Sequence, residues 1–416
     1  MEKIAFLFPG QGAQYRGMFK THWVRYPEVR QTFEEASDTL GLDLFSLCSE
    51  GTEEELTRPQ NTQPALLTAG VAAYRAWTRE TGVVPFALAG HSLGEYTALV
   101  CSGAIPFNET LAIVRQRGWL MKEAASAGKG GMLAVNGMTG PEAEALLSEL
   151  PEFDGQLAVA CYNSSRQQVL SGPEAAMMEV ERKLTARGMK TIPLKVGAAF
   201  HGPSMADAAR QLETFLRERA ASIGTPRQPV VSNATALPYE EGAESIIRGL
   251  VLEMTEPVLW KQTMEYLRNQ AMEAAIDFGP QRTMKHLLLQ DDPAAVVYAF
   301  DFPEDHEKLF SPEWKARRRS RSNRRLLEAC LVAAVATPNR NEDRMEYTEG
   351  AVKPYREIEE LLRESERRGA EPTDDDVRAA LELLTVILRT KRASEQEQLE
   401  RTNAIAFEIH RKAGSL

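Results

Sequence analysis

The chain has 416 residues, a formal net charge of −10 and a hydrophobic fraction of 43%. These values are ordinary for a globular protein, and the length predicts two or three domains. The acidic charge argues against non-specific nucleic-acid binding, and no apolar run approaches the ~20 residues of a membrane span. We therefore expect no nucleic-acid partner and no membrane partner.

The cysteines are few and scattered, and none has the spacing of metal ligands. The apolar stretch at the N-terminus is too short for a signal peptide. We therefore expect a cytoplasmic protein with reduced thiols and no metal site. The four cysteines are Cys48, Cys101, Cys161 and Cys330.

Strand and helix patterns alternate over the first 125 residues. A short apolar run at Ile4–Phe8 ends in Pro9-Gly10 and predicts a strand, and Thr62–Thr78 has helical spacing. A second strand is predicted over Val84–Ala89 and a second helix over Glu95–Cys101. This alternation is typical of an α/β domain with a parallel sheet.

Small residues near Gly128 predict a boundary, and the next 70 residues follow the order βαββαβ. That order is typical of a ferredoxin-like domain. The predicted elements are Met132–Val135, Pro141–Leu150, Leu157–Cys161, Gln168–Ser171, Pro173–Arg187 and Lys190–Leu194.

After this insertion the α/β pattern resumes. We expect helices over Ser204–Ala220 and Thr255–Gln270, a strand over Pro229–Ser232, and a last strand over Ala274–Asp277. Residues 351–411 are charge-rich with helical spacing and follow a basic run, Lys315–Arg325. The predicted domains are therefore 1–125 with 198–305, an insertion at 126–197, and a helical extension at 306–416.

The motif G-x-S-x-G occurs at Gly90–Gly94, between a predicted strand and a predicted helix. In that context the glycines allow a sharp turn that exposes the serine at the end of the sheet. The alternative, a glycine-rich loop without chemistry, is less favoured. Ser92 is therefore the candidate nucleophile, and the large domain is expected to be α/β-hydrolase-like.

A serine nucleophile needs a base, and His201 is the candidate among six histidines. It lies where the chain leaves the predicted insertion and re-enters the large domain. Its position alone is equally compatible with a packed histidine that has no catalytic role.

Several motifs in fixed order resemble the malonyl-CoA:acyl carrier protein transacylases of fatty-acid and polyketide synthesis. The resemblance covers roughly residues 1–300. Its motifs are Pro9–Gln14, Gly90–Glu95, Arg115–Gly118 and Ala199–His201, extended by Asn61–Ala65, Asn163–Ser164, Val231–Asn233, Pro257–Trp260 and Phe278–Pro280.

The resemblance implies a ping-pong reaction without a bound cofactor. Ser92 would attack malonyl-CoA with His201 as base, and the phosphopantetheine thiol of an acyl carrier protein would then accept the malonyl group. The backbone N–H groups of Gln11 and Leu93 would form the oxyanion hole. The second donor also follows from the elbow motif.

The resemblance also assigns the remaining site residues. Arg117 would bind the malonyl carboxylate, and a bulky Phe200 would crowd a methyl branch. The backbone carbonyl of Glu253 would orient His201, although relatives commonly carry glutamine or asparagine there. A carboxylate at this position is expected to raise the pKa of His201.

The last 110 residues resemble the extension of free-standing acyltransferases that load polyketide/non-ribosomal peptide assembly lines in trans. The basic run Lys315–Arg325 suits a solvated linker better than a docking surface for an acidic carrier protein. Open alternatives are a housekeeping fatty-acid enzyme and an acyl hydrolase that clears stalled carrier proteins. A non-catalytic scaffold and a general serine esterase are less favoured.

Overall fold

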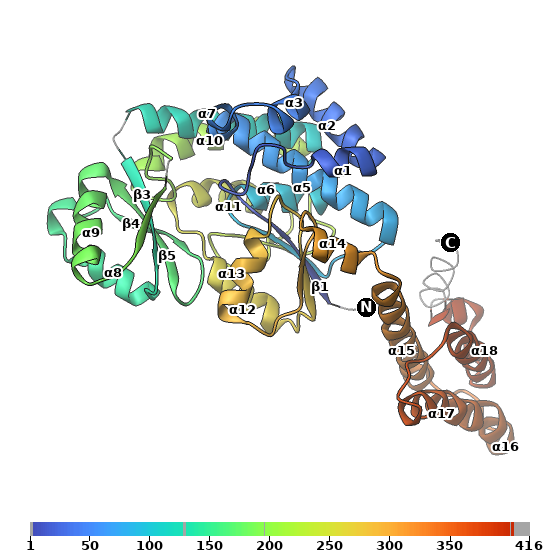
Figure 1. Ribbon diagram of the computed structural model, residues 1–416. Helices are drawn as coiled ribbons and strands as arrows, with labels where there is room; N and C mark the ends of the chain where they lie inside the picture. Colours follow the sequence, from blue (N-terminus) through green and yellow to red (C-terminus); the bar gives the residue numbers. More distant parts are fainter. Residues whose placement is uncertain (1–2, 128–129, 195, 400, 403–416) are drawn as a thin grey trace. The chain divides into compact units, whose positions relative to one another are not determined.

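The computed structural model describes residues 3–127, 130–194, 196–399 and 401–402. This part of the chain forms two compact units, one from Lys3 to His306 and one that begins at Glu307 (Figure 1). The domain bounds proposed from the sequence stay predictions. The side chains of residues 315–322, within the basic run, lie outside the described part.

A parallel sheet lies at the centre of the first unit. Among the described residues it has five strands in the order β7-β2-β1-β8-β9. Every residue of the central strand β1 is buried, because helices cover both faces of the sheet. The predicted α/β fold class is confirmed. The strands are β1 (Ile4–Phe8), β2 (Ala87–Gly90), β7 (Val230–Val231), β8 (Ala274–Asp277) and β9 (Val297–Ala299).

One strand and one helix of the first unit differ from the sequence prediction. The strand at Ala274–Asp277 is not the last one, because β9 pairs with it in parallel. The helix predicted from Thr255 begins instead at Trp260, since α11 ends at Thr255 and Pro257 interrupts the chain. The sequence analysis did not predict α11, and this helix carries Glu253.

The helices of the first unit pack around the parallel sheet, with α6 against β1 and β2 and with α5 against α6. No helix among the described residues is long and apolar enough to cross a membrane. The helices are α1 (Lys20–Arg25), α2 (Pro27–Leu40), α3 (Leu44–Ser49), α4 (Glu53–Thr57), α5 (Pro59–Thr81), α6 (Leu93–Cys101), α7 (Phe107–Ala127), α10 (Ala206–Arg217), α11 (Ala243–Thr255), α12 (Trp260–Asn269), α13 (Thr283–Asp291) and α14 (Pro303–Leu309).

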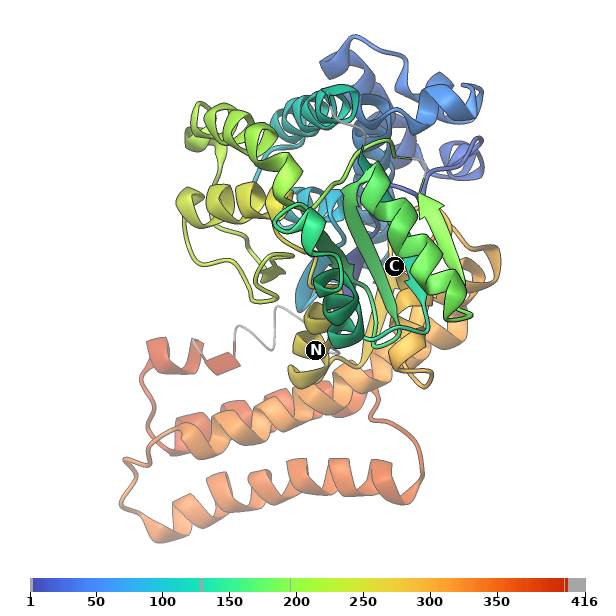
Figure 2. The same ribbon diagram turned by 90° about the vertical axis from the view of Figure 1, so that its left-hand side faces the viewer.

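A second, antiparallel sheet is inserted in this unit. Its described strands follow the order β4-β5-β3-β6, and α8 and α9 cover one face (Figure 2). This is the predicted ferredoxin-like arrangement. Side chains of β3 alternate, so that Leu133 and Val135 enter the core under the helices. The elements are β3 (Gly130–Asn136), α8 (Gly140–Ser148), β4 (Ala158–Tyr162), β5 (Gln167–Pro173), α9 (Glu174–Ala186) and β6 (Thr191–Leu194).

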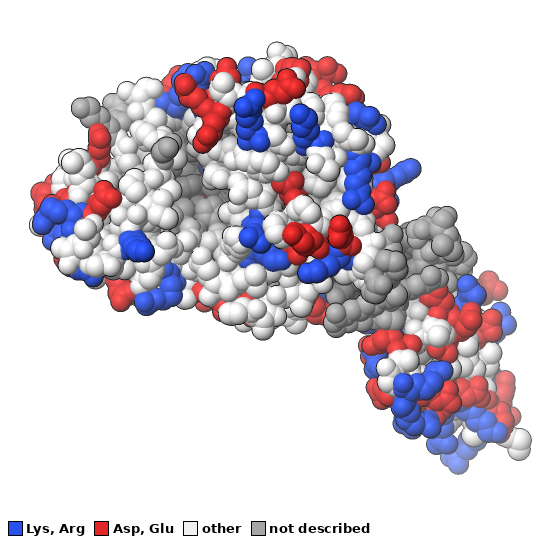
Figure 3. Space-filling view, in the orientation of Figure 1, with Lys and Arg blue, Asp and Glu red and all other residues white. Residues whose placement is uncertain are grey.

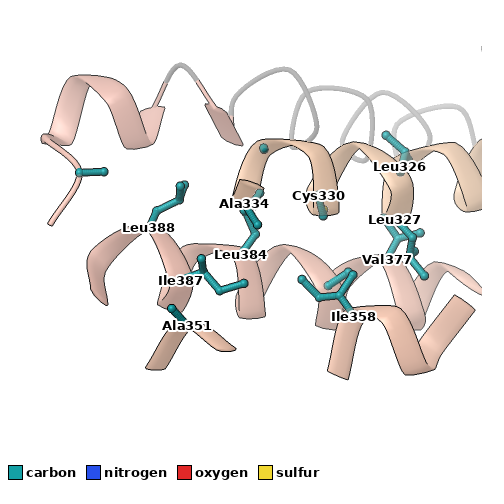
Figure 4. Close-up of a cluster of buried hydrophobic side chains, with 13 residues drawn as sticks. Leu326, Leu327, Cys330, Ala334, Ala351, Ile358, Val377, Leu384, Ile387 and Leu388 are labelled. Atoms are coloured by element: carbon teal, nitrogen blue, oxygen red, sulfur yellow. The ribbon is translucent and has the colours of Figure 1, made fainter. Parts of the chain in front are cut away.

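The unit that begins at Glu307 is helical, as predicted. Its core is aliphatic and lies between α15, α17 and α18 (Figure 4). Ile358, Leu384, Ile387 and Leu388 are fully or almost fully buried there. The helices are α15 (Pro312–Ala336), α16 (Arg344–Tyr347), α17 (Lys353–Arg367) and α18 (Asp374–Thr390).

Candidate active site

Ser92 lies in a strained turn between β2 and α6. Its backbone has φ 50° and ψ −112°, which a non-glycine residue rarely adopts. The neighbouring Gly94 is held close to β1, and a Cβ there would lie 2.0 Å from the Phe8 carbonyl oxygen. The predicted strand–turn–helix context is therefore present, and it exposes the serine hydroxyl at the carboxyl end of the sheet.

Asn233, which follows the end of β7, stabilises this turn through hydrogen bonds. Its Oδ1 accepts a 2.7 Å hydrogen bond from the Ser92 N–H, and its Nδ2 donates to the Gly90 carbonyl at 2.6 Å. The Asn233 N–H in turn donates to Glu95 Oε2 at 2.8 Å. No role for Asn233 was predicted from the sequence. Its position could have indicated a role, because a polar residue directly after a predicted parallel strand lies at the carboxyl edge of the sheet, where ligand sites form.

His201 contacts both Ser92 and Glu253. Its Nε2 lies 3.0 Å from Ser92 Oγ, and its Nδ1 lies 2.7 Å from the backbone oxygen of Glu253. Since that oxygen can only accept, Nδ1 carries the proton and Nε2 is free to accept the serine proton.

Glu253 raises the pKa of His201 only through the hydrogen bond of its backbone oxygen, and larger effects outweigh this contribution. Burial, together with the positive charge of Arg117, lowers the pKa of His201 to about 3. The carboxylate of Glu253 points to Arg117, and the contact between Glu253 and the imidazole is made by the backbone. His201 is therefore a neutral imidazole near pH 7.

Arg117 is buried beside the serine, with 1% of its surface exposed. Its Nη2 donates to Ser92 Oγ at 3.0 Å, and its Nη1 donates to Gln63 Oε1 on α5 at 3.1 Å. The next residue, Gly118, lets α7 lie close to α5. A Cβ at this position would lie only 2.7 Å from the Gln60 Cα. Gln63 belongs to a segment that carried the resemblance, but sequence reasoning gave it no role.

Arg115 is half-buried and donates to the Leu40 carbonyl at 2.8 Å. It ties α7 to the end of α2. Two positions along a helix separate side chains by roughly 200°, so Arg115 and Arg117 lie on different faces of α7. Arg115 therefore makes no contact with the serine, and it offers a matched control for Arg117.

A cavity of about 270 Å³ adjoins these groups. It lies between the two sheets of the first unit: Ser92 and His201 line one side, and Met132 and Ala134 of β3 line the other. These β3 residues alternate with those that fill the core under α8 and α9, so one strand serves both the cavity and the small core.

The remaining predicted residues surround the same cavity. Gln11 and the buried Phe200 line it directly. Leu93 is the first residue of α6, so its backbone N–H has no acceptor within the helix and lies next to Ser92. The structure thus brings all seven predicted residues to one place: Gln11, Ser92, Leu93, Arg117, Phe200, His201 and Glu253.

Within the described residues, no cluster of three or more histidine, cysteine or acidic side chains could hold a metal ion. The four cysteines are free and buried.

The chain is similar to known acyltransferases over most of its length. It is 34% identical to a malonyl CoA-acyl carrier protein transacylase from Bacillus subtilis over 399 residues, which are 96% of this chain and 99% of that protein. It is 38% identical to the enzyme of that name from Escherichia coli K12 over 289 residues, which are 69% of this chain and 92% of that one.

Solved structures agree with these relatives. A malonyl-CoA:acyl carrier protein transacylase from Xanthomonas oryzae superposes with a TM-score of 0.71 at 37% identity, covering 74% of this chain and 97% of that one. A type II polyketide malonyl-transacylase, solved with its acyl-carrier protein, has a TM-score of 0.70 at 36% identity, covering 74% and 99%. Residues 5–291 match the acyl transferase domain, and the chain belongs to this family of acyltransferases.

Proposed function

We propose that this chain is an acyl carrier protein S-malonyltransferase that works through a malonyl ester on Ser92. Ser92 Oγ attacks the thioester carbon of malonyl-CoA while His201 Nε2 takes the hydroxyl proton. His201 returns that proton to the leaving sulfur, so CoA departs as a thiol. The phosphopantetheine thiol of the carrier protein then attacks the ester carbon with His201 as base again, and the proton passes from His201 to the released Ser92 Oγ. The oxyanion is stabilised by the N–H groups of Leu93 and Gln11.

One observation carries the substrate assignment: a buried guanidinium lies 3.0 Å from the nucleophile oxygen. In a malonyl ester the carboxylate carbon is two C–C bonds, about 2.5 Å, from the carbonyl carbon. Only a short dicarboxylic acyl group can therefore reach Arg117 while its thioester lies at Ser92. An acyl hydrolase for stalled chains would have no use for a buried cation at this point.

Phe200 supports malonyl over its branched homologue. Its ring is buried in the cavity wall, where it would meet a substituent on the malonyl methylene. A single methyl group is worth about 1–3 kcal/mol of discrimination, so we expect methylmalonyl-CoA to react roughly 10- to 200-fold more slowly. Phe200→Ala should reduce this difference.

The carrier-protein half of the reaction can be tested in two separate steps. The enzyme is incubated with malonyl-CoA, freed of it by gel filtration, and mixed with a carrier protein with or without its phosphopantetheine arm. The malonyl mass should move to the carrier with the arm only, and the enzyme should return to its unmodified mass. Loss of malonate to water at equal rates in both mixtures would contradict the transferase proposal.

We further propose that the chain loads carrier proteins in trans, as a free-standing enzyme of a polyketide or hybrid assembly line. The alignment with the Bacillus subtilis relative extends through the helical unit, whereas the alignment with the Escherichia coli enzyme covers 289 residues. A housekeeping role in fatty-acid synthesis is the alternative. A chain that ends after Ser311, beyond α14, should load a fatty-acid carrier protein as the full chain does but an assembly-line carrier protein less efficiently.

The truncation has two informative outcomes. A higher KM for the assembly-line carrier alone would support a docking role of the helical unit. Equal kcat/KM values of both chains for both carriers would remove the support for such a role.

A further inference from the structure

Glu253 lies beside the catalytic groups, and its side chain has no assigned task. Its backbone oxygen binds His201, but its carboxyl group turns to the other side, where Oε1 lies 3.4 Å from Arg117 Nη2. Both side chains are buried, with exposed fractions of 1% and 0%. Such an ion pair needs further hydrogen bonds to compensate the loss of water.

Those further bonds are incomplete on both partners. Within the described chain, Glu253 Oε2 and Arg117 Nε are buried and have no hydrogen-bond partner. An unpaired acceptor and an unpaired donor on one buried ion pair are unusual in a native protein. They are the groups that a bound carboxylate could use, because Arg117 Nε can donate to it directly, and Glu253 can donate to it if protonated.

Few positive charges near Glu253 could neutralise a second buried anion beside it. Arg117 is the permanent cation, and burial lowers the pKa values of His91 and His201, so both are neutral. Burial, helped by Glu253, raises the pKa of Glu95 to about 8. The other titratable groups that interact with Glu253 are Tyr96, Tyr239 and Cys161, whose pKa values burial raises, and the Ser92 hydroxyl.

A malonyl carboxylate at Arg117 would place two carboxylates on one buried guanidinium. Like charges that share such a site cannot both remain ionised without a large cost, and one of them takes up a proton. Glu253 is the group prepared for this, because burial already raises its pKa against the opposing effects of Arg117 and Ser92. The result is a neutral acid beside a bound substrate anion.

We propose that Glu253 controls the affinity of Arg117 for the acyl carboxylate, since the substrate replaces Glu253 on Arg117 as Glu253 takes up one proton from solvent. This inference rests on the proposed malonyl transfer and names the group that links it to pH. Glu253 is a specificity-tuning residue in this account, because an acyl group without a carboxylate has no reason to displace the ion pair.

The direct test is calorimetric titration of the Ser92→Ala chain, which binds malonyl-CoA without reacting. Heats measured in buffers of different ionisation enthalpy give the number of protons taken up. Acetyl-CoA, which shares the CoA moiety but lacks the carboxylate, is the reference ligand. Malonyl-CoA should take up as much as one proton more than acetyl-CoA, and its affinity should fall by up to about tenfold per pH unit above neutrality.

Two variants, one on α11 and one directly after its last residue, identify the group that takes up the proton. Glu253→Gln keeps the backbone carbonyl and the side-chain shape. It should therefore abolish the extra proton uptake and flatten the pH dependence of the affinity for malonyl-CoA. Glu256→Gln removes a charge from the exposed position three residues further on, and it should leave both unchanged. Thermal unfolding of each variant shows whether it is folded.

The outcomes separate this inference from the proposed function. Equal proton uptake with malonyl-CoA and acetyl-CoA overturns the role of Glu253 even if Glu253→Gln does not fold. Extra uptake that persists in Glu253→Gln overturns it too, because another group would then hold the proton. Failure of malonyl-CoA to bind at all would instead contradict the proposed function.

Discussion

The two units of the chain bury polar groups for different reasons. In the helical unit the buried Lys391 donates to the carbonyls of Ala334 and Thr337 at the end of α15, and Asn323 bonds the start of α18. These polar groups satisfy helix ends. In the first unit Arg117, His201 and Glu253 gather around Ser92. The side chains of Arg117 and Glu253 serve no helix end, and Arg117 Nε and Glu253 Oε2 have no hydrogen-bond partner among the described residues. A buried charged group that does not bond to a helix end is therefore a better indication of a functional site than one that does.

The surfaces differ as well. Charged side chains crowd the visible face of the helical unit, whereas a broad uncharged area lies on the visible face of the first unit (Figure 3). Side chains also cap the first turns of three helices of the helical unit, at Ser311, Asp343 and Thr373. Its features are those of stable helices, and none of the residues around Ser92 belongs to it.

The largest effect should follow from His201→Ala. Without the base at 3.0 Å from Ser92 Oγ, acylation by malonyl-CoA should fall by about 10⁴-fold or more. His286→Ala, on the exposed side of α13, is the matched control and should react normally. Rapid-quench measurement of the acyl-enzyme checks both. A residual rate within tenfold of the parent chain would remove His201 from the mechanism.

Arg117→Ala should have the next largest effect. It removes the cation for the malonyl carboxylate and leaves Glu253 buried without its partner, so kcat/KM for malonyl-CoA should fall by about 10²–10³-fold. The kcat/KM for acetyl-CoA should fall far less. Arg115→Ala, which loses only the bond to Leu40, should keep the preference for malonyl-CoA. Equal losses for both thioesters would mean that Arg117 supports the fold rather than substrate choice.

In the helical unit, Leu384→Ala should affect stability alone. Leu384 is fully buried in the aliphatic core, so its truncation should cost about 2–5 kcal/mol of that unit's free energy of unfolding. Acylation of Ser92 should keep its rate, because Asn233, His201 and Arg117, which hydrogen-bond to Ser92 in the described part of the chain, all belong to the first unit. Denaturant unfolding followed by helical circular dichroism, with a parallel acylation assay, measures both. A slower acylation would show that the units are coupled.

The smallest effect should be the response of acylation to acid. A base acts when it is neutral, and the pKa of His201 is lowered to about 3, so its neutral form persists as the pH falls through the ordinary histidine range. The single-turnover rate at saturating malonyl-CoA should be nearly flat from about pH 8 down to about pH 5. An acidic limb near the ordinary histidine value would contradict the neutral, buried imidazole.

The sequence predicted the parts of this site that depend on local pattern. Gly90–Gly94 predicts the turn from the motif alone, and the βαββαβ order predicts the inserted sheet. The helix α11 was missed, although Glu253 was named by resemblance. The orientation of the Glu253 carboxyl toward Arg117 depends on how α11 and α7 are placed by α10, which packs against both of them. These contacts are long-range in the chain, and no local pattern contains that information. The same reason explains why Asn233 and Gln63 were overlooked.

The most direct test of malonyl transfer is the intact mass of the protein after mixing with malonyl-CoA, methylmalonyl-CoA or acetyl-CoA. The account predicts one malonyl adduct on the parent chain, little or none from the other thioesters, and no adduct on Ser92→Ala. An adduct that persists in Ser92→Ala, or the absence of any malonyl adduct on the parent chain, would contradict it.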